Sequence, residues 1–388
     1  MITKEHKKHS DIARPSYGNY CRNEWAIVGS QCDATRSLAD DIIKALSPEY
    51  NCAFADAKHT VENETATLRG ATIEYINHAN YHQFNYTKEF NQYQYRQAFN
   101  DADIILVNGN HFEANAQVIV IDESKKESLR KRLSQLTNVE MILLADNEIE
   151  VFDFIKEALP SWDQLPLHTL NETDKIIGFF KKRMQQATPL LNGLVLAGGK
   201  SIRMGYDKGI ISWHGKEQQY YVADLLQSLC NDVYISCRLD QQKEIDNKYQ
   251  TLADTFTDLG PFGAILSAFR EKPDRAWLVV ACDLPLLDSK TLQYLKDHRD
   301  PSSTATAFES AYNSLPEPLI TIWEPKSYPV LLSFLSQGYN CPVKALRNSD
   351  TFILQPPDPE ALTNVNTREE LEKVQQLLQK KLPVNHAI

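Results

Sequence analysis

A short loop that combines glycines with basic residues carries the clearest chemical signal in the sequence. The apolar run 193–197 has the composition of a β-strand and stops at Gly198 and Gly199. Because glycine has no Cβ, backbone N–H groups at these positions can approach a ligand closely, although two glycines alone would also fit an ordinary turn. Cations that could neutralise a triphosphate follow closely: Lys200, Arg203 and Lys208. This pattern predicts a phosphate-binding loop at the end of a strand.

Polar side chains also follow later apolar runs. Ser236 and Arg238 close one run, Asp254 precedes a Gly-Pro-x-Gly turn, and Asp283 follows a run whose unbroken apolar character predicts a central, buried strand. In an open parallel sheet, ligands bind outside the carboxyl ends of the strands, so these side chains should face the same crevice as the glycine loop. A carboxylate there can hold Mg²⁺ or accept hydrogen bonds from a base or a ribose, whereas an aspartate before a turn can also be structural.

The residues from Leu196 to Lys208 read Leu-Ala-Gly-Gly-Lys-Ser-Ile-Arg-Met-Gly-Tyr-Asp-Lys. This string resembles the L-A-G-G-x-S-x-R-M-G-x-D-K signature of the molybdenum cofactor guanylyltransferases, and the resemblance covers residues 190–378. It implies a Rossmann-like nucleotidyltransferase fold that moves GMP from GTP to the phosphate of molybdopterin, releasing pyrophosphate and using Mg²⁺. The catalytic positions it implies are Arg203, Lys208 and Asp283. The GTP-binding positions it implies are Leu196, Ala197, Gly198, Gly199, Lys200, Ser201, Lys208, Ser236, Asp254 and Asp283.

A later segment adds candidate metal and acceptor contacts. Asn364-Val-Asn-Thr-Arg-Glu-Glu-Leu resembles the family's N-V-N-T-P-E-E-L, with Arg368 in place of proline. Asn364 and Asn366 should point to one side of an extended segment. They could contact a phosphate or the metal that the resemblance assigns to Asp283. A purely structural role, in which they only shape the start of the following helix, fits equally well. On the expected acceptor side, basic residues that could meet the molybdopterin phosphate are Lys344 and Arg347.

The N-terminal half alternates short apolar runs with amphipathic stretches, which predicts a parallel sheet with helices on its faces. The order is similar to that of the molybdopterin-guanine dinucleotide accessory GTPase, a P-loop protein, and Lys-His-Thr at 58–60 fits that family. The loop predicted at 29–37 departs from it. A P-loop needs Gly-Lys-Ser/Thr where Ala34, Thr35 and Arg36 stand, and Asn108 replaces the expected carboxylate. The sequence therefore predicts a degenerate domain that keeps the frame without the phosphoryl-transfer chemistry.

These observations divide the chain into four parts. They are a flexible tail at 1–22, a degenerate P-loop-like domain at 23–165, a linker helix at 166–189 and a nucleotidyltransferase domain at 190–388. Both domains are expected to be α/β, each with a mostly parallel sheet flanked by helices. The stretch 75–99, rich in Tyr, Asn and Gln, is either an insertion packed on its own domain or an exposed aromatic face for a partner.

Composition limits the classes of partner. The chain has 388 residues, 42% of them hydrophobic, and a formal net charge of −10, which is typical of a soluble globular protein and argues against nucleic-acid binding. No apolar run is long enough to span a bilayer, and the first residues lack a signal-peptide core, so we expect a cytoplasmic protein without membrane partners. Seven scattered cysteines without a C-x-x-C pair predict reduced thiols. The resemblance adds GTP, molybdenum cofactor, and molybdoenzyme apoproteins or chaperones as partners.

Two other functions fit parts of the sequence. A cytidylyltransferase or a sugar-phosphate nucleotidyltransferase would share the fold, but cytidylyltransferases resemble L-A-A-G where this chain has Gly198 after Ala197. A non-catalytic adaptor that carries cofactor would be expected to have lost Asp283 or the basic residues of the loop. Neither is lost, which favours an enzyme specific for guanine.

Overall fold

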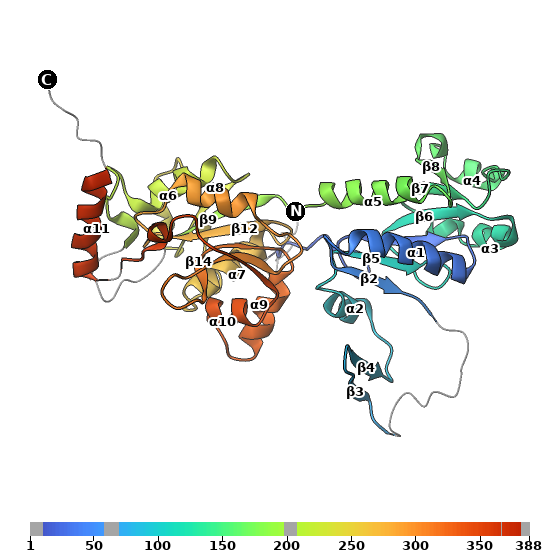
Figure 1. The fold of residues 1–388 in the computed structure, drawn as a ribbon, viewed down its shortest axis with the longest axis horizontal. Coiled ribbons are helices and arrows are strands. Elements are labelled where there is room, and N and C mark those ends of the chain that lie inside the picture. Colours follow the sequence, from blue (N-terminus) through green and yellow to red (C-terminus); the bar gives the residue numbers. More distant parts are fainter. Residues whose placement is uncertain (1–10, 58–69, 198–207, 366, 382–388) are drawn as a thin grey trace, which may run out of the picture. The chain divides into compact units, whose positions relative to one another are not determined.

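The chain folds into two compact units (Figure 1). Ser16–Ala187 form the first unit, and Thr188–Ile388 form the second unit together with the N-terminal residues up to Pro15. In this computed structural model the described residues are 11–57, 70–197, 208–365 and 367–381. Each unit has its own β-sheet with helices on both faces, so the expected α/β class with mostly parallel sheets is confirmed. No helix in these described ranges is long and apolar enough to cross a membrane.

The first unit is built on a six-stranded parallel sheet. Its strands are β1 (Glu24–Val28), β2 (Cys52–Ala55), β5 (Ile104–Asn108), β6 (Ala116–Ile121), β7 (Val139–Leu144) and β8 (Leu167–Thr169). They lie in the order β2-β5-β1-β6-β7-β8, and every neighbouring pair is parallel. All residues of β1, β5 and β6 are buried, as expected for strands covered on both faces.

Helices cover both faces of this sheet. They are α1 (Cys32–Leu46), α2 (Gln92–Ala98), α3 (Lys126–Arg130), α4 (Asp153–Ala158) and α5 (Thr173–Gln186). Ile42 of α1 and Phe180 of α5 are fully buried on one face, and Leu129 of α3 and Ile155 of α4 on the other. Full burial of such a side chain stabilises a fold by about 1.5–3 kcal/mol. The segment expected at 166–189 as a linker helix therefore contributes α5 to the core of the first unit.

The segment before β1 is more ordered than the tail expected at 1–22. The side chain of Glu24, which is 2% exposed, accepts hydrogen bonds from the backbone N–H groups of Asn19, Tyr20 and Asn115 at 2.7–2.8 Å. Tyr20 itself is buried in the core. A buried carboxylate needs such donors, and the sequence around Glu24 does not indicate which backbone groups supply them.

A β-hairpin stands apart from the six-stranded sheet (Figure 1). It consists of β3 (Ile73–Asn77) and β4 (His82–Tyr86). Tyr75 is paired with Phe84, and Ile73 with Tyr86, so that these four exposed side chains share one face. Within the stretch 75–99, the hairpin thus presents aromatic side chains to solvent.

The second unit is built on a seven-stranded sheet. Its strands are β9 (Leu191–Leu196), β10 (Val233–Cys237), β11 (Gln250–Ala253), β12 (Ala276–Ala281), β13 (Ala305–Glu309), β14 (Pro316–Trp323) and β15 (Thr351–Leu354). They lie in the order β11-β10-β9-β12-β14-β13-β15. Only β14 runs antiparallel to its neighbours β12 and β13. The predicted central strand is confirmed, because β12 is buried throughout.

Helices again cover both faces of the second sheet. They are α6 (Gln218–Gln227), α7 (Pro261–Glu271), α8 (Ser289–Asp297), α9 (Ser327–Ser336), α10 (Pro342–Arg347) and α11 (Arg368–Lys381). Leu226 of α6 and Leu295 of α8 are buried on one face, and Phe262 of α7 and Leu346 of α10 on the other. Helix α11 packs through Val374 in a small separate cluster. The central strands of the sheet are therefore covered on both faces.

A buried ion pair ties the start of the second unit to its sheet. The Arg299 guanidinium donates to both carboxylate oxygens of Glu324, at 2.6 and 2.8 Å, and to the Pro189 carbonyl oxygen at 2.9 Å. Glu324 follows β14 and is fully buried. Bidentate pairs of this kind are strong, and removing one partner leaves an uncompensated buried charge.

Replacing Arg299 by methionine should destabilise the second unit by about 3–5 kcal/mol, because the Glu324 carboxylate would stay buried without its cation. Loss of hydrogen-exchange protection in β12 and β14 measures the effect. The control is Arg270→Met, which removes a partly exposed ion pair with Glu271 at 3.6 Å and should cost less than about 1 kcal/mol. Equal losses in the two variants would contradict the prediction.

Candidate functional site

Four parallel strands of the second unit end at one edge of its sheet. Leu196, the last residue of β9, is paired with Ser236 of β10 and with Ala281 of β12. The Ala197 N–H donates to the Ser236 carbonyl oxygen at 3.2 Å, and β11 runs parallel to β10. The residues that follow these strands therefore meet at the same edge, as the sequence predicts.

Most of the predicted phosphate loop lies outside the described residues: Gly198, Gly199, Lys200, Ser201 and Arg203. Leu196 and Ala197 are described, and Ala197 is 7% exposed at the end of β9. The chain is described again from Lys208, which begins a turn of 3-10 helix at Lys208–Ile210. The two ends of the loop are thus placed.

Ser236 and Asp254 form a hydrogen-bonded pair at this edge. Ser236 Oγ donates to Asp254 Oδ1 at 2.5 Å, and Ser236 is 1% exposed. Burial raises the pKa of Asp254 above its ordinary value, although the Ser236 hydrogen bond and the nearby Arg238 guanidinium partly lower it. The second carboxylate oxygen of Asp254 can accept a hydrogen bond from an N–H or O–H group of a ligand.

The position of Asp254 depends on the loop that packs against the start of α7. Ser267 Oγ accepts the N–H groups of Thr255 at 2.9 Å and Phe256 at 3.2 Å, and donates to the Gly263 carbonyl oxygen at 2.7 Å. A Cβ on Gly263 would collide with the Phe256 carbonyl oxygen. The Gly-Pro-x-Gly turn read from the sequence is therefore needed for close packing of the loop that follows Asp254.

Asp283 follows β12 directly and is joined to the Asn364 segment. The Val365 N–H donates to the Asp283 carbonyl oxygen at 2.9 Å. Asp283 and Asn364, which the sequence analysis assigned to one site, are thus brought together, whereas Asn366 lies outside the described residues.

Carboxylate and amide oxygens suit Mg²⁺, which commonly takes one or two carboxylates together with substrate phosphates and water. Asp283 and Asn364 supply such oxygens on segments joined by a hydrogen bond. No group of three or more His, Cys, Asp or Glu arranged to hold a metal occurs among the residues that the structure describes.

Two side chains that the sequence analysis missed hold the turn after Asp283. His214 Nε2 contacts the Pro285 carbonyl oxygen at 2.9 Å, and Gln218 Nε2 donates to the Leu284 carbonyl oxygen at 3.3 Å. Gln218 is fully buried at the start of α6. Neither residue stands in a recognisable motif, so only the contact reveals that they position this turn.

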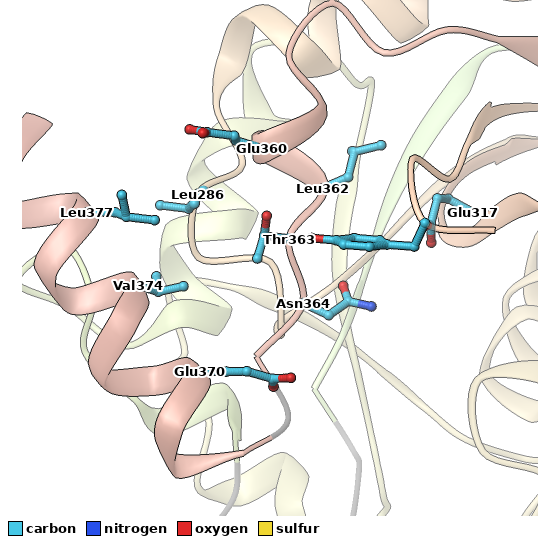
Figure 2. A pocket seen from close by; sticks show the side chains of 10 residues that line it. Leu286, Glu317, Glu360, Leu362, Thr363, Asn364, Glu370, Val374 and Leu377 are labelled. Carbon is cyan, nitrogen blue, oxygen red and sulfur yellow. The ribbon is translucent and has the colours of Figure 1, made fainter. Parts of the chain in front are cut away.

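A cavity of about 620 Å³ lies beside Asn364 (Figure 2). Its side chains come from the turn after β12, from β14 and the loop before it, from the segment 360–364 and from α11. The carboxylates of Glu317, Glu360 and Glu370 line it together with apolar side chains such as Leu286. Such a lining suits a ligand that has several N–H or O–H donors on a partly apolar body.

The two basic residues expected on the acceptor side, Lys344 and Arg347, lie on α10, which packs against β14 and α9. Lys344 Nζ lies 3.4 Å from the centre of the Tyr339 ring. Neither residue is among those that line the cavity beside Asn364. Their contact with an acceptor phosphate stays a prediction.

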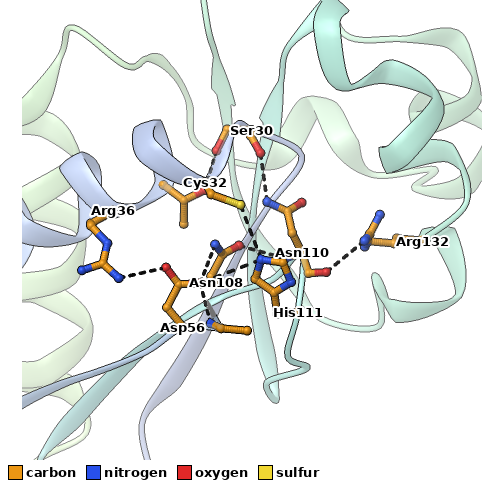
Figure 3. A network of polar contacts seen from close by, with 10 residues as sticks. Ser30, Cys32, Arg36, Asp56, Asn108, Asn110, His111 and Arg132 are labelled. Atoms are coloured by element: carbon orange, nitrogen blue, oxygen red, sulfur yellow. Dashed lines mark hydrogen bonds and ion pairs between the residues drawn. The ribbon is translucent and has the colours of Figure 1, made fainter. Parts of the chain in front are cut away.

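The corresponding edge of the first unit is built differently (Figure 3). The loop predicted at 29–37 is wrong in extent, because α1 begins at Cys32. Ser30 Oγ and Thr35 Oγ1 lie 2.7 Å apart and both residues are buried. Thr35 is thus a buried residue of the first turns of α1. The spacing of apolar residues does not reveal this, because the residues before Leu38 are mostly polar.

Charged and amide side chains fill the same edge of the first unit. Arg36 donates to Asp56 Oδ2 at 3.2 Å, and Asn108 Nδ2 donates to Asp56 Oδ1 at 2.9 Å. Asn110 Nδ2 donates to the Ser30 carbonyl oxygen at 2.9 Å. The arginine that stands near the expected P-loop lysine thus pairs with a carboxylate of the protein. The Lys-His-Thr at 58–60 lies outside the described residues.

Comparison with known proteins agrees with this geometry. Residues 193–350 match the family described as MobA-like NTP transferase domain. The sheet, the strand-end carboxylates and this match define the second unit as a nucleotidyltransferase domain.

The names of similar proteins indicate the family within this class. The chain is 34% identical over 189 residues to a molybdenum cofactor biosynthesis bifunctional protein of a Synechocystis species, covering 48% of this chain and 54% of that protein. It is 33% identical over 114 residues to a molybdenum cofactor guanylyltransferase of Pseudomonas entomophila, covering 29% of this chain and 60% of that protein. It is 31% identical over 193 residues to a probable molybdenum cofactor guanylyltransferase of Trichormus variabilis, covering 48% of this chain and 90% of that protein. The chain belongs to the molybdenum cofactor guanylyltransferase family, although it spans little more than half the length of the first two relatives.

Replacing Ser236 by alanine should raise the pKa of Asp254 further, because a hydrogen bond that favours the carboxylate is lost while burial remains. With the folded pKa above the unfolded pKa, the contribution of Asp254 to stability is present below the unfolded pKa and is lost as pH rises through the folded pKa. Carboxyl-carbon NMR titration measures the shift. Ser228→Ala, at the exposed residue that follows the last turn of α6, should leave the Asp254 titration unchanged. An unaltered Asp254 titration in Ser236→Ala would refute the pairing.

Proposed function

We propose that the second unit transfers GMP from GTP to the phosphate of molybdopterin and releases pyrophosphate. The observation that carries this proposal is the convergence at one sheet edge of Ala197, which begins the predicted phosphate loop, with Asp254 and Asp283. The names of the relatives, molybdenum cofactor guanylyltransferases, support the choice of nucleotide and acceptor. The activity of the whole chain is part of the proposal.

The reaction needs no covalent enzyme intermediate. An oxygen of the acceptor phosphate attacks the α-phosphorus of GTP, a new P–O bond forms, and the bond to the pyrophosphate oxygen breaks in line with it. The acceptor oxygen is already ionised at neutral pH, so no general base is required. The protein contributes positioning and charge neutralisation, with Lys200, Arg203 and Lys208 acting on the triphosphate and the departing pyrophosphate.

Asp283 would hold Mg²⁺, and Asn364 would contact the same metal or a phosphate. When bound, the metal would neutralise charge on the triphosphate oxygens. The hydrogen bond between the Val365 N–H and the Asp283 carbonyl oxygen keeps the two side chains on adjoining segments. His214 and Gln218 are positioning residues in this proposal, because they hold the turn after Asp283.

Asp254, held by Ser236, would bind the base of the nucleotide. Guanine presents adjacent N–H donors on one edge, and the second carboxylate oxygen of Asp254 can accept one of them. A base without these donors would leave a half-buried carboxylate poorly solvated, which costs binding energy. The pair thus gives a physical reason for guanine preference.

The cavity beside Asn364 would receive the acceptor. A pterin ring carries several N–H donors on a flat body, which matches the carboxylates of Glu317, Glu360 and Glu370 and the apolar side chains around them. Its place next to Asn364 would bring the acceptor phosphate toward Asp283.

The direct test is to incubate the purified chain with Mg²⁺, molybdopterin and each nucleoside triphosphate in turn, and to identify the product by mass. Molybdopterin guanine dinucleotide should form from GTP, with pyrophosphate released in equal amount. Equal or better use of CTP would move the protein to the cytidylyltransferases. Product with a sugar phosphate in place of molybdopterin would refute the acceptor.

Asp283→Asn should lower turnover by about a hundredfold to a thousandfold, because the neutral amide holds Mg²⁺ poorly and leaves the triphosphate charge uncompensated. Steady-state rates over a range of Mg²⁺ concentrations measure the loss, and circular dichroism checks the fold. The matched control is Asp297→Asn at the exposed end of α8, which should retain full activity. Near-normal turnover of Asp283→Asn at low Mg²⁺ would remove Asp283 from the metal site.

We propose further that the first unit is a docking or scaffold module and not a working GTPase. Its loop after β1 is short, Thr35 is bonded to Ser30, and Arg36 is paired with Asp56. A phosphate cradle requires open backbone N–H groups and a free lysine. Molybdoenzyme apoproteins or chaperones are candidate partners for such a module.

The fragment 16–187 should fold and show no GTP hydrolysis above background. It includes α5, which a fragment ending at residue 165 would lose together with the buried Phe180. Release of inorganic phosphate from GTP with Mg²⁺ measures the activity, and the full chain without acceptor serves as a reference. Mg²⁺-dependent hydrolysis by the fragment that disappears in Arg36→Ala would overturn the scaffold role.

A further inference from the structure

A thiol and an imidazole meet at the strand-end edge of the first unit (Figure 3). Cys32 Sγ lies 3.4 Å from His111 Nε2. Cys32 is the first residue of α1, which follows β1, and His111 follows β5. Because β1 and β5 are paired in parallel, their carboxyl ends are adjacent and the sheet fixes this contact.

Three features surround the pair. Cys32 stands in the first turn of the 15-residue helix α1, where the helix dipole favours negative charge. His111 can take the thiol proton across the contact. Asp56 Oδ1 lies 3.9 Å from the same ring nitrogen and favours the protonated ring. The contact therefore places a proton acceptor directly beside the thiol.

Asp56 is itself held as an anion by its neighbours. Burial alone would raise the pKa of Asp56, but hydrogen bonds from the Ala57 N–H, Arg36 and Asn108 outweigh it and keep the pKa below its ordinary value. The carboxylate is thus ionised at neutral pH. Its negative charge is shared with Arg36, whose guanidinium lies 3.2 Å away.

Other thiols of the chain are in a different setting. Burial raises the pKa of Cys21 and Cys230 to about 12, and that of Cys52 and Cys237 to about 11. A thiol with a raised pKa contains little thiolate at neutral pH and reacts slowly. Cys32 differs from them in that it stands at a helix N-terminus and contacts an imidazole.

We propose that Cys32 and His111 form an activated thiol that reacts with peroxide, a modification site in a different unit from the nucleotidyltransferase site. The thiolate sulfur attacks one peroxide oxygen, an S–O bond forms, and the O–O bond breaks. Sulfur loses two electrons and becomes a sulfenic acid, while the peroxide is reduced. The departing hydroxide takes the proton from His111 and leaves as water, so the ring ends neutral.

The test uses the full chain. Iodoacetamide labelling at neutral pH, followed by mass analysis of each cysteine peptide, compares Cys32 with the exposed Cys341. An imidazole that takes the thiol proton speeds attack by the sulfur, so Cys32 should be labelled about tenfold faster than Cys341. After treatment with hydrogen peroxide, a sulfenic-acid probe should label Cys32 first.

Variants separate the pair from a structural role. His111→Gln should lower the labelling rate of Cys32 by about tenfold and should remove the thiolate ultraviolet absorbance, as Cys32→Ser also should. His168→Gln, which alters a histidine beside Glu172 in the same unit, is the matched control and should change neither. Labelling of Cys32 no faster than Cys341, or an unchanged rate in a folded His111→Gln chain, would overturn the proposal.

Discussion

The parallel pairing of β9 with β10 and β12 is the constraint on which the site of the second unit depends. Because Leu196 is in register with both Ser236 and Ala281, the chain leaves three adjacent strands at the same height. Asp283 follows one strand, and the predicted phosphate loop follows another. A shift of one residue in any of these pairs would turn alternate side chains to the opposite face and separate the groups that the proposed reaction needs.

Hydrogen bonds from neighbouring segments then fix the positions of Asp283 and of the loop after Asp254. The Val365 N–H binds the Asp283 carbonyl oxygen, and Ser267 holds the loop that follows Asp254. The first of these bonds joins segments that are distant in sequence, the second fixes a local loop, and both are present before any ligand binds. Preorganisation of this kind reduces the entropy lost on binding and is worth more in catalysis than an additional flexible contact.

The two units use the same architecture for different ends. In both, parallel strands carry polar residues to one edge. In the second unit those residues adjoin a cavity and a loop with the sequence of a phosphate cradle. In the first unit, Arg36 and Asn108 are hydrogen-bonded to Asp56, so the polar side chains at that edge pair with one another. A fold of this class is therefore compatible with catalysis, with a scaffold, or with a separate thiol chemistry at Cys32.

The sequence by itself determined the α/β class, the buried strand β12, and the location of Asp283 at its carboxyl end, because apolar runs and strand-end polar residues are local signals. Only the tertiary structure decided where α1 begins, that α5 belongs to the first unit, and that the Val365 N–H is hydrogen-bonded to the Asp283 carbonyl oxygen. These features depend on side chains that meet across long stretches of chain, such as Cys32 and His111, 79 residues apart. The periodicity of apolar residues does not predict such contacts. It indicates which segments form helices and strands, whereas the contacts depend on how those elements pack together.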